Sequence, residues 1–197
     1  QERGLEINEY GLYHGEECIE CVDETAFFAA MDLAYIPPEL REGLGEIQAA
    51  AEDALPTLVT AADIRGMLHV HSTYSDGADS LETMAEAVRA RGYEYLGIAD
   101  HSQSAAYAGG LRTDAVKRQW DEIDQLNEKL APFRIFKGIE SDILGDGSLD
   151  YTDDILQQFE YIVVSVHSQF NLDREKMTAR IVRAIEHPAA TIVGHLT

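Results

Sequence analysis

From Met67 onward the sequence alternates short apolar segments with amphipathic segments, and this alternation constrains the fold more than any other feature of the chain. The segments expected to form strands are 67–71, 95–99, 134–139, 161–166 and 191–194. Because strand and helix units that repeat at this length build parallel sheets, we expect either a doubly wound α/β fold or an α/β barrel. The run YIVVSV at 161–166 is apolar throughout, as is typical of a parallel strand covered on both faces.

Helical spacing of apolar residues marks the segments between these strands. The first helix is expected to begin after Asp79, which with Glu82 resembles a capping box, and to end at Gly92. Val116 and Leu130 mark a long second helix. A short helix is expected at 153–159 and another at 173–186.

Each expected strand ends in residues that can bind a metal ion. His69 and His71 are two apart on the first strand, so their imidazoles should point to one face, and Asp76 follows on the next turn. The later strands are followed by Asp100 and His101, by Glu140, by His167 and by His195. An isolated His-x-His motif is as compatible with two structural histidines as with a metal site. Its recurrence with other ligands at the carboxyl ends of five strands, where α/β barrels collect functional groups, predicts a metal cluster.

These motifs resemble those of the PHP family of phosphoesterases, named for polymerases and histidinol phosphatases. The matching segments, in chain order, are LHVHSTYSDG, IADH, KGIES, VVSVHS and IVGH. The resemblance implies a distorted, TIM-like (β/α) barrel and a cluster of two or three divalent ions, manganese and/or zinc. It implies that the ligands are His69, His71, Asp76, His101, Glu140, His167 and His195, with Glu140 as the bridging carboxylate.

The N-terminal part of the chain sharpens this resemblance. The segments INEYGLY, TAFFAAMDLAYIPPELREGLGEI and LPTLVTAADIRG resemble the junction between the thumb and the C-terminal PHP domain of bacterial and archaeal family X DNA polymerases. We therefore expect the end of a thumb subdomain at 1–46, a linker at 47–66 and a PHP domain at 67–197. The thumb part should be a small α+β tail, with an extended segment at 5–13 and a helix at 23–31.

The PHP-like part is expected to be incomplete. A complete PHP domain supplies two further ligands, an Asp and a His, beyond the fifth strand. A (β/α) barrel also takes about 200 residues or more, whereas roughly 130 follow the linker here. We expect an unclosed barrel, a fragment that lacks at least two ligands and is inactive on its own.

The reaction that the resemblance implies is phosphoester hydrolysis, in which grouped divalent ions activate water and stabilise the leaving oxygen. His69, His71, Glu140 and His167 would form the catalytic core. Three serines are neighbours of expected ligands: Ser72, Ser102 and Ser168. None lies in the sharp turn, the nucleophile elbow, that presents the catalytic serine of a serine hydrolase, so we interpret them as turn residues. Asp100, beside His101, could be a ligand or could orient a ligating imidazole, and we favour the second role, outside the ligand set.

Three further residues are candidate substrate contacts. Tyr107 lies in the loop HSQSAAYAGGLRT and could stack on a nucleobase, although an incidental loop tyrosine is an equal alternative. Arg112 and Lys137 could contact phosphate, with ordinary surface solvation as the alternative.

Net charge, cysteines and hydropathy limit the function further. The formal charge of −21 disfavours a basic nucleic-acid surface, but carboxylates can hold the cations that meet a phosphate. Cys18 and Cys21 form one CxxC without two further nearby ligands, so we expect two reduced thiols. The absence of a long apolar run or signal peptide predicts a cytoplasmic protein with no membrane partner and no evident obligate protein partner.

The expected function is that of part of a family X DNA polymerase whose intact PHP domain acts on DNA ends as a metal-dependent 3′-5′ exonuclease in repair. One alternative is a small-molecule phosphatase of the histidinol-phosphate type, which the YIPPELRE lead-in disfavours. The other alternative is a metal-stabilised PHP scaffold without catalysis, which loss of ligands would indicate.

Overall fold

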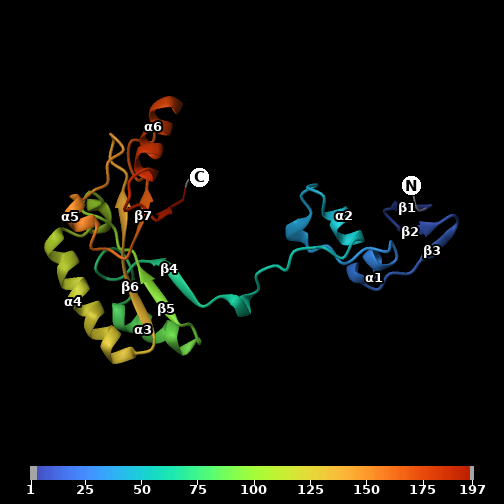
Figure 1. Ribbon diagram of the computed structural model, residues 1–197, viewed down its shortest axis with the longest axis horizontal. Helices are drawn as coiled ribbons and strands as arrows, with labels where there is room; N and C mark the ends of the chain where they lie inside the picture. The colour runs from blue at the N-terminus through green and yellow to red at the C-terminus, as the bar shows by residue number, and fades with distance from the viewer. Residues whose placement is uncertain (1–3, 196–197) are drawn as a thin grey trace. The chain divides into compact units, whose positions relative to one another are not determined.

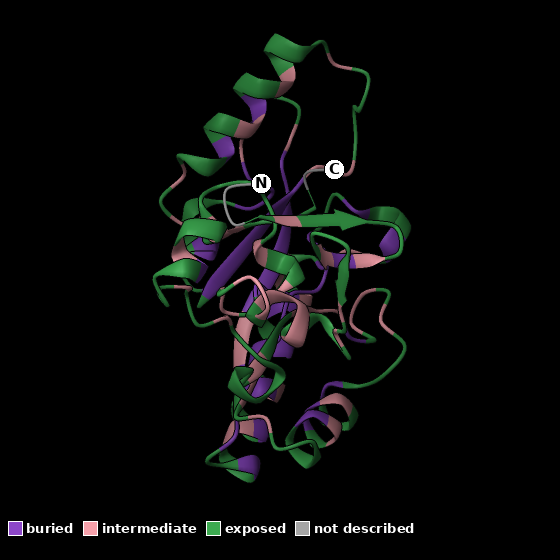
Figure 2. Ribbon diagram, turned by 90° about the vertical axis from the view of Figure 1, so that its right-hand side faces the viewer, coloured by how far each residue is buried: buried purple, intermediate pink, exposed green. Residues whose placement is uncertain are grey.

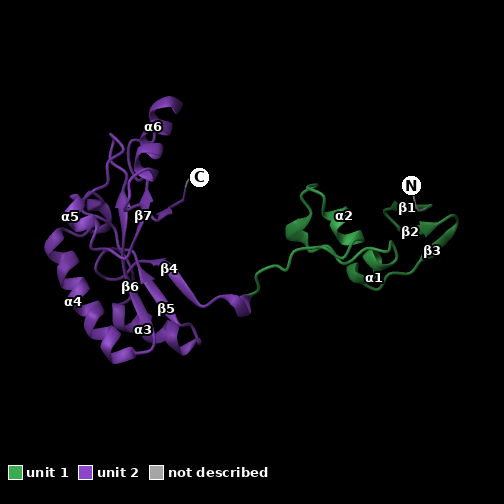
Figure 3. Ribbon diagram, in the orientation of Figure 1, with its two compact units in different colours: residues 1–60 green, residues 61–197 purple. Residues whose placement is uncertain are grey.

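The structure is a computed structural model that describes residues 4–195, and it divides into two compact units at Thr60 and Ala61 (Figure 3). Among residues 4–195, no helix combines the length and the apolar character needed to cross a lipid bilayer.

The first unit contains a small antiparallel sheet and short helices. Strands β1 (Leu5–Asn8), β2 (Gly11–His14) and β3 (Glu17–Ile19) pair in chain order. They are followed by α1 (Glu24–Ala29), a 3-10 helix (Pro38–Leu40) and α2 (Glu46–Ala51). In place of the single extended segment expected at 5–13, the structure has a three-stranded meander, and Cys18 lies on its third strand. In the described part of this unit, the buried apolar residues are Leu12, Ile36 and Ala50.

The second unit has the alternating strands and helices that the sequence predicts. After a 3-10 helix at Ala61–Asp63, its strands are β4 (Gly66–Val70), β5 (Tyr95–Ile98), β6 (Arg134–Asp142), β7 (Tyr161–Ser165) and β8 (Ile192–Val193). All neighbours are parallel and follow chain order. Between them lie α3 (Leu81–Ala90), a 3-10 helix (Ala106–Ala108), α4 (Thr113–Leu130), α5 (Asp153–Leu156) and α6 (Arg174–Ile185) (Figure 1). The unit thus has the strand order of part of a (β/α) barrel, as the sequence predicts.

One face of this sheet packs against the helices. Ile98 of β5 and Ile135 of β6 are fully buried in a cluster with apolar residues of α3 and α4, such as Ile123. Ile139 and Ile162 lie in a second cluster that includes Trp120 of α4 and Leu156 of α5. The strands and the inward sides of these helices form the buried part of the unit in Figure 2. Burial of this face supplies the main hydrophobic stabilisation.

Alternate residues of the same strands point to the opposite face, which we call the inner face. Tyr161, Val163 and Ala99 form a separate buried cluster there, with Phe136 against it. Glu140 is four residues beyond Phe136 on β6, so it shares this face at the carboxyl end of the strand. The inner face thus changes from apolar to polar along the strands, and its polar end is the candidate site.

Two of the predicted boundaries that differ from the structure do so for clear local reasons. β6 continues to Asp142, so Glu140 lies within the strand and not after it. The N-cap of α3 is Ser80, whose hydroxyl accepts a hydrogen bond from the amide of Thr83 at 3.2 Å, and not Asp79. The end of α3 at Gly92 is confirmed, because Gly92 adopts a φ of 86° that favours glycine.

Candidate metal centre

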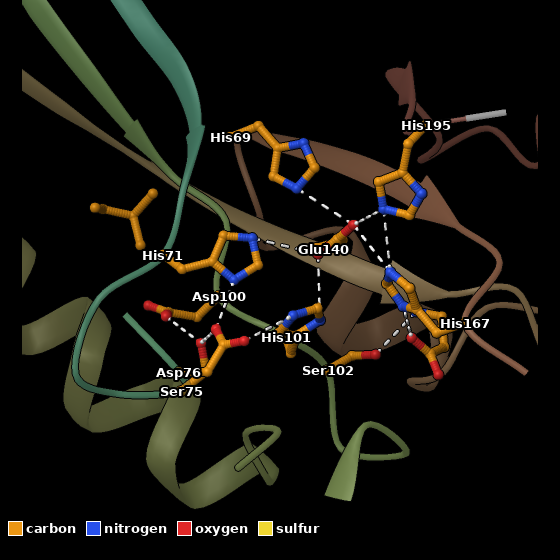
Figure 4. Close-up of polar contacts among 12 residues, drawn as sticks. His69, His71, Ser75, Asp76, Asp100, His101, Ser102, Glu140, His167 and His195 are labelled. Carbon is orange, nitrogen blue, oxygen red and sulfur yellow. Dashed lines mark hydrogen bonds and ion pairs between the residues drawn. The ribbon is translucent and has the colours of Figure 1, made fainter. Parts of the chain in front are cut away.

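Five imidazoles surround the carboxylate of Glu140, which is 1% exposed (Figure 4). Each contributes one ring nitrogen within hydrogen-bonding or near-contact distance of a carboxylate oxygen. The distances to Oε1 are 3.3 Å from His69 Nε2, 3.3 Å from His167 Nε2 and 3.0 Å from His195 Nε2. The distances to Oε2 are 3.3 Å from His71 Nε2 and 3.2 Å from His101 Nδ1. The expected convergence of strand-end histidines is therefore present in the structure.

His69 and His71 reach Glu140 by a different backbone path from the regular strand that we expected. The pairing of β4 with β5 shifts between Met67, opposite Leu96, and Val70, opposite Ile98, so β4 contains a bulge. Within it, His69 has a φ of 60°, in the left-handed region that few residues other than glycine adopt. His71 lies beyond the last strand residue. Regular strand alternation therefore does not explain how the two imidazoles come to face Glu140.

Asp76 lies beside two of the histidines, on the turn that follows β4. Its Oδ1 is 3.0 Å from His71 Nδ1 and its Oδ2 is 3.6 Å from His101 Nε2. The turn is tight, since a Cβ at Gly77 would overlap the backbone of His71 and Ser72. Asp76 therefore sits at the edge of the cluster, where a carboxylate could share an ion with His71 and His101.

Asp100 has a different role from its neighbour His101 because it points to the helix face. Its carboxylate accepts hydrogen bonds from the amide and hydroxyl of Ser72 at 2.7 and 2.6 Å and from Gln119 of α4 at 2.6 Å. It also accepts one from the hydroxyl of Ser75. These donors occupy both oxygens, so Asp100 holds the turn that carries Asp76. Its place outside the ligand set stays a prediction.

Sequence reasoning missed Asp142, which supports His167. Asp142 Oδ1 is 2.6 Å from His167 Nδ1, and Oδ2 accepts a hydrogen bond from the hydroxyl of Ser104 at 2.9 Å. A carboxylate on the second nitrogen fixes the ring orientation and raises the basicity of a metal-binding histidine. The available signal was its position two residues after Glu140, on the same strand face, but the strand was expected to end before it.

The donor set fits divalent metal ions. Three groups have ligand atoms within 4.8 Å of one another: His69, His71 and Glu140; His71, Asp76 and His101; and His101, Glu140 and His167. Among the described residues, His101 Nδ1 is a buried nitrogen that lies 3.2 Å from Glu140 Oε2 but makes no hydrogen bond. His167 Nε2 and His195 Nε2 face each other at 3.2 Å, an arrangement that needs a proton or a cation between the two nitrogens. These groups could hold metal ions.

The charges in the cluster follow from burial and from its partners. Burial alone would raise the pKa of Glu140, but hydrogen bonds from His69 and His71 outweigh it and hold the pKa far below its usual range. The hydrogen bond to Glu140 raises the pKa of His71, whereas burial lowers the pKa of His101. Glu140 is therefore an anion, the state that a bridging ligand requires.

The three candidate substrate contacts differ in where they lie relative to the cluster. Tyr107 is 71% exposed, and its ring centroid is 6.0 Å from that of His101 and 6.4 Å from that of His167. Arg112 is exposed at the N-cap of α4. Lys137 is not brought to the cluster: it points to the helix face of β6, where its Nζ is 2.6 Å from Asp124 of α4.

The three serines next to the expected ligands make structural hydrogen bonds, and the two cysteines lie outside the groups of possible ligands. Ser72 donates to Asp100, and the hydroxyl of Ser102 accepts a hydrogen bond from the amide of Asp142 at 2.9 Å. The carbonyl of Ser168 accepts one from the buried Arg180 at 2.8 Å. Cys18 and Cys21 are free thiols and belong to none of the three groups of ligands found among the described residues.

Known proteins with similar sequences agree with this geometry. Residues 67–195 match the PHP domain family, and residues 1–42 match the DNA polymerase beta thumb family. The DNA polymerase/3'-5' exonuclease PolX of Bacillus subtilis (strain 168) is 41% identical over 199 aligned positions, which cover 100% of this chain and 35% of that protein.

Two probable phosphatases match the PHP-like part of the chain. One, from Caldanaerobacter subterraneus subsp. tengcongensis, is 27% identical over 139 residues, covering 64% of this chain and 50% of the relative. Another, from Thermoanaerobacter sp. (strain X514), is 29% identical over 133 residues, covering 64% and 51%. The chain thus spans about a third of the polymerase relative and about half of the phosphatases. Together with the sheet order and the histidine cluster, these matches show that the chain belongs to the PHP family, with an N-terminal segment of the DNA polymerase beta thumb type.

Proposed function

We propose that this chain carries most of a multi-metal phosphoesterase site, which in the whole protein acts as a 3′-5′ exonuclease on DNA and is joined to a DNA polymerase. The observation that carries the proposal is the convergence of five imidazoles on the buried Glu140. The similarity to a DNA polymerase/3'-5' exonuclease along the full chain supports the substrate class.

The proposed ligands are His69, His71, Asp76, His101, Glu140, His167 and His195, and the proposed ions are two or three of manganese and/or zinc. Imidazole and carboxylate donors suit both metals. Divalent ions held there would supply the activation of water and the neutralisation of phosphate charge that phosphoester hydrolysis requires.

The chain's own residues prepare this site in distinct ways. His69, His71, Glu140 and His167 form its proposed catalytic core. Asp142 fixes the orientation of His167, and the Asp100 network holds the turn of Asp76. Glu140 itself is buried, with a side chain 1% exposed, which strengthens its electrostatic interactions.

Substrate contacts are proposed beside the cluster. The exposed ring of Tyr107 lies close to His101 and His167, where it could stack on an unpaired base. Arg112 stays a proposed phosphate contact. Lys137 does not, because Asp124 engages it on the opposite strand face.

Further proposals concern the whole protein. In the whole protein, DNA would reach the site with the help of a thumb subdomain. Residues 1–46 are the proposed end of this thumb, residues 47–66 are the proposed linker, and the proposed PHP domain begins at residue 67. The charge of −21 makes metal ions the main local attraction for phosphate. A cytoplasmic location is the setting that fits action on DNA.

A small-molecule phosphatase remains the second candidate, because two probable phosphatases are 27% and 29% identical to the PHP-like part. The two functions differ in substrate: a phosphatase cleaves terminal phosphomonoesters, whereas an exonuclease cleaves internucleotide diesters. A metal-stabilised scaffold would cleave neither.

The test is digestion of DNA labelled at its 5′ end by the whole protein with added manganese. We expect stepwise shortening from the 3′ end, and we expect His69→Ala to abolish it while circular dichroism shows an intact fold. Lys137→Ala is the matched control and should digest normally. Shortening that persists in His69→Ala would contradict the proposal, and cleavage of phosphomonoesters alone would favour the phosphatase.

A further inference from the structure

Tyr161, the first residue of β7, spans the inner face of the sheet. It is 7% exposed and lies in the apolar cluster with Ala99 and Val163. Its ring covers two glycines on the neighbouring strands, Gly138 of β6 and Gly97 of β5. A Cβ built at Gly138 would overlap the ring, and one at Gly97 would lie 2.7 Å from the hydroxyl oxygen. The ring therefore reaches from β7 across two strands because both lack side chains there.

The hydroxyl of Tyr161 ends at the bulge of β4. It donates a hydrogen bond to the carbonyl of Ile98 at 2.9 Å and accepts one from the amide of His69 at 3.3 Å. The hydroxyl can fill both roles, because it has one proton to donate and lone pairs that accept. A single phenol thus links β7, β5 and the backbone of a metal-site histidine.

His69 needs such support because of its backbone conformation. A residue with a side chain persists at a φ of 60° only where the surrounding structure determines it. The bulge also removes its amide from the regular ladder, so this part-buried amide needs an acceptor from elsewhere. The hydroxyl of Tyr161 is that acceptor.

We propose that Tyr161 is a positioning residue of the metal centre: its hydroxyl holds His69 in the left-handed bulge that aims the imidazole at Glu140. This inference rests on the proposed metal site and adds a residue that touches neither the ions nor the substrate. It also explains Gly97 and Gly138, which leave the ring room to reach β4.

The test compares Tyr161→Phe with the unaltered chain. The phenylalanine ring still covers both glycines, so only the hydrogen bonds are lost. Cobalt(II) is titrated into the metal-free protein, because its visible absorption reports the number and geometry of ligands. We expect a changed spectrum and a metal affinity that is about 10- to 100-fold weaker, as for other groups that orient a metal ligand.

The control is Tyr151→Phe, which removes another buried tyrosine hydroxyl that donates to a backbone carbonyl, that of Leu111. It should leave the spectrum and the affinity unchanged. Thermal unfolding with a chelator present checks that both variants fold. If Tyr161→Phe does not fold, Gly138→Ala, whose added Cβ would overlap the Tyr161 ring from β6, is titrated in its place with the same expectation.

A double-mutant cycle separates positioning from general destabilisation. Since Tyr161 acts through His69, Tyr161→Phe should have no further effect on cobalt affinity in the His69→Ala background. Unaltered protein that binds no cobalt would contradict the proposed metal site itself. Normal binding by the unaltered protein, with the same spectrum and affinity in Tyr161→Phe, would overturn the positioning role alone. A full additional loss in the His69→Ala background would also overturn it.

Discussion

The two faces of β6 show how one strand serves stability and function separately. Ile135 and Ile139 point to the helices and are fully buried in apolar clusters. Gly138 and Glu140 point to the inner face, where one makes room for Tyr161 and the other is surrounded by imidazoles. Because neighbouring residues of a strand face opposite ways, substitutions one position apart should have different consequences.

The buried polar groups of the inner face, which the proposed chemistry requires, lower the free energy of unfolding. Burying an ionised carboxylate costs free energy unless partners compensate for the lost hydration. At Glu140 the partners are histidines that a metal ion would bind in their deprotonated form. On the helix face, the polar residues of β6 are Lys137 at its solvent edge and Ser141, whose hydroxyl accepts a hydrogen bond from the amide of Asp150 at 3.0 Å.

The largest effect is expected for Glu140→Gln. Loss of the central carboxylate charge should reduce metal-dependent DNA hydrolysis by roughly 1000-fold or more, since ligand loss should exceed the 10- to 100-fold cost of losing a supporting residue. Initial rates at saturating manganese measure it. Unfolding in urea with a chelator present should be little changed, and a variant with near-normal rates would break the distinction between the two faces.

Ile139→Ala, one residue away, is expected to have the opposite profile. Removal of a fully buried side chain from the helix face should lower the free energy of unfolding by about 2–5 kcal/mol. Denaturant titration measures this loss. At temperatures where the variant stays folded, its metal affinity should be normal, so a selective loss of metal binding would count against the comparison.

Asp142→Asn should have a smaller effect on the metal site. An amide cannot supply the negative charge beside His167 Nδ1, so metal affinity should weaken by about 10- to 100-fold. Isothermal titration with manganese provides the value. Unchanged affinity would mean that the hydrogen bond to Asp142 does not tune His167.

The smallest effect is expected for Lys137→Ala. Its ion pair with the exposed Asp124 is of the surface type, worth at most about 1 kcal/mol. Unfolding and DNA hydrolysis should both stay near those of the unaltered protein. A large loss of hydrolysis would show that Lys137 contacts substrate after all.

The sequence predicted the order of elements and the location of the site because both follow from periodic patterns. Apolar segments alternate with helical ones from Met67 onward, and the ligands recur at the strand ends, so their convergence follows from a parallel sheet. The first unit was less predictable. Its strands β1 to β3 have three or four residues each, which is too short for a clear alternation.

The details missed in the site depend on contacts between distant segments. The bulge at His69 is stabilised by Tyr161, 92 residues away, and no local pattern reveals it. The role of Asp142 requires both the exact length of β6 and the position of His167. Ser80 replaces Asp79 as N-cap through a shift of one residue, within the usual uncertainty of helix ends.

The central claim is that the inner face of this sheet holds a metal cluster around Glu140. Anomalous diffraction from crystals grown with manganese, collected where manganese scatters strongly, locates bound ions directly. The account predicts at least two anomalous peaks between the carboxylate of Glu140 and the surrounding imidazoles, and their loss in crystals of Glu140→Gln. Fully ordered histidines with no peak among them at saturating manganese would contradict it.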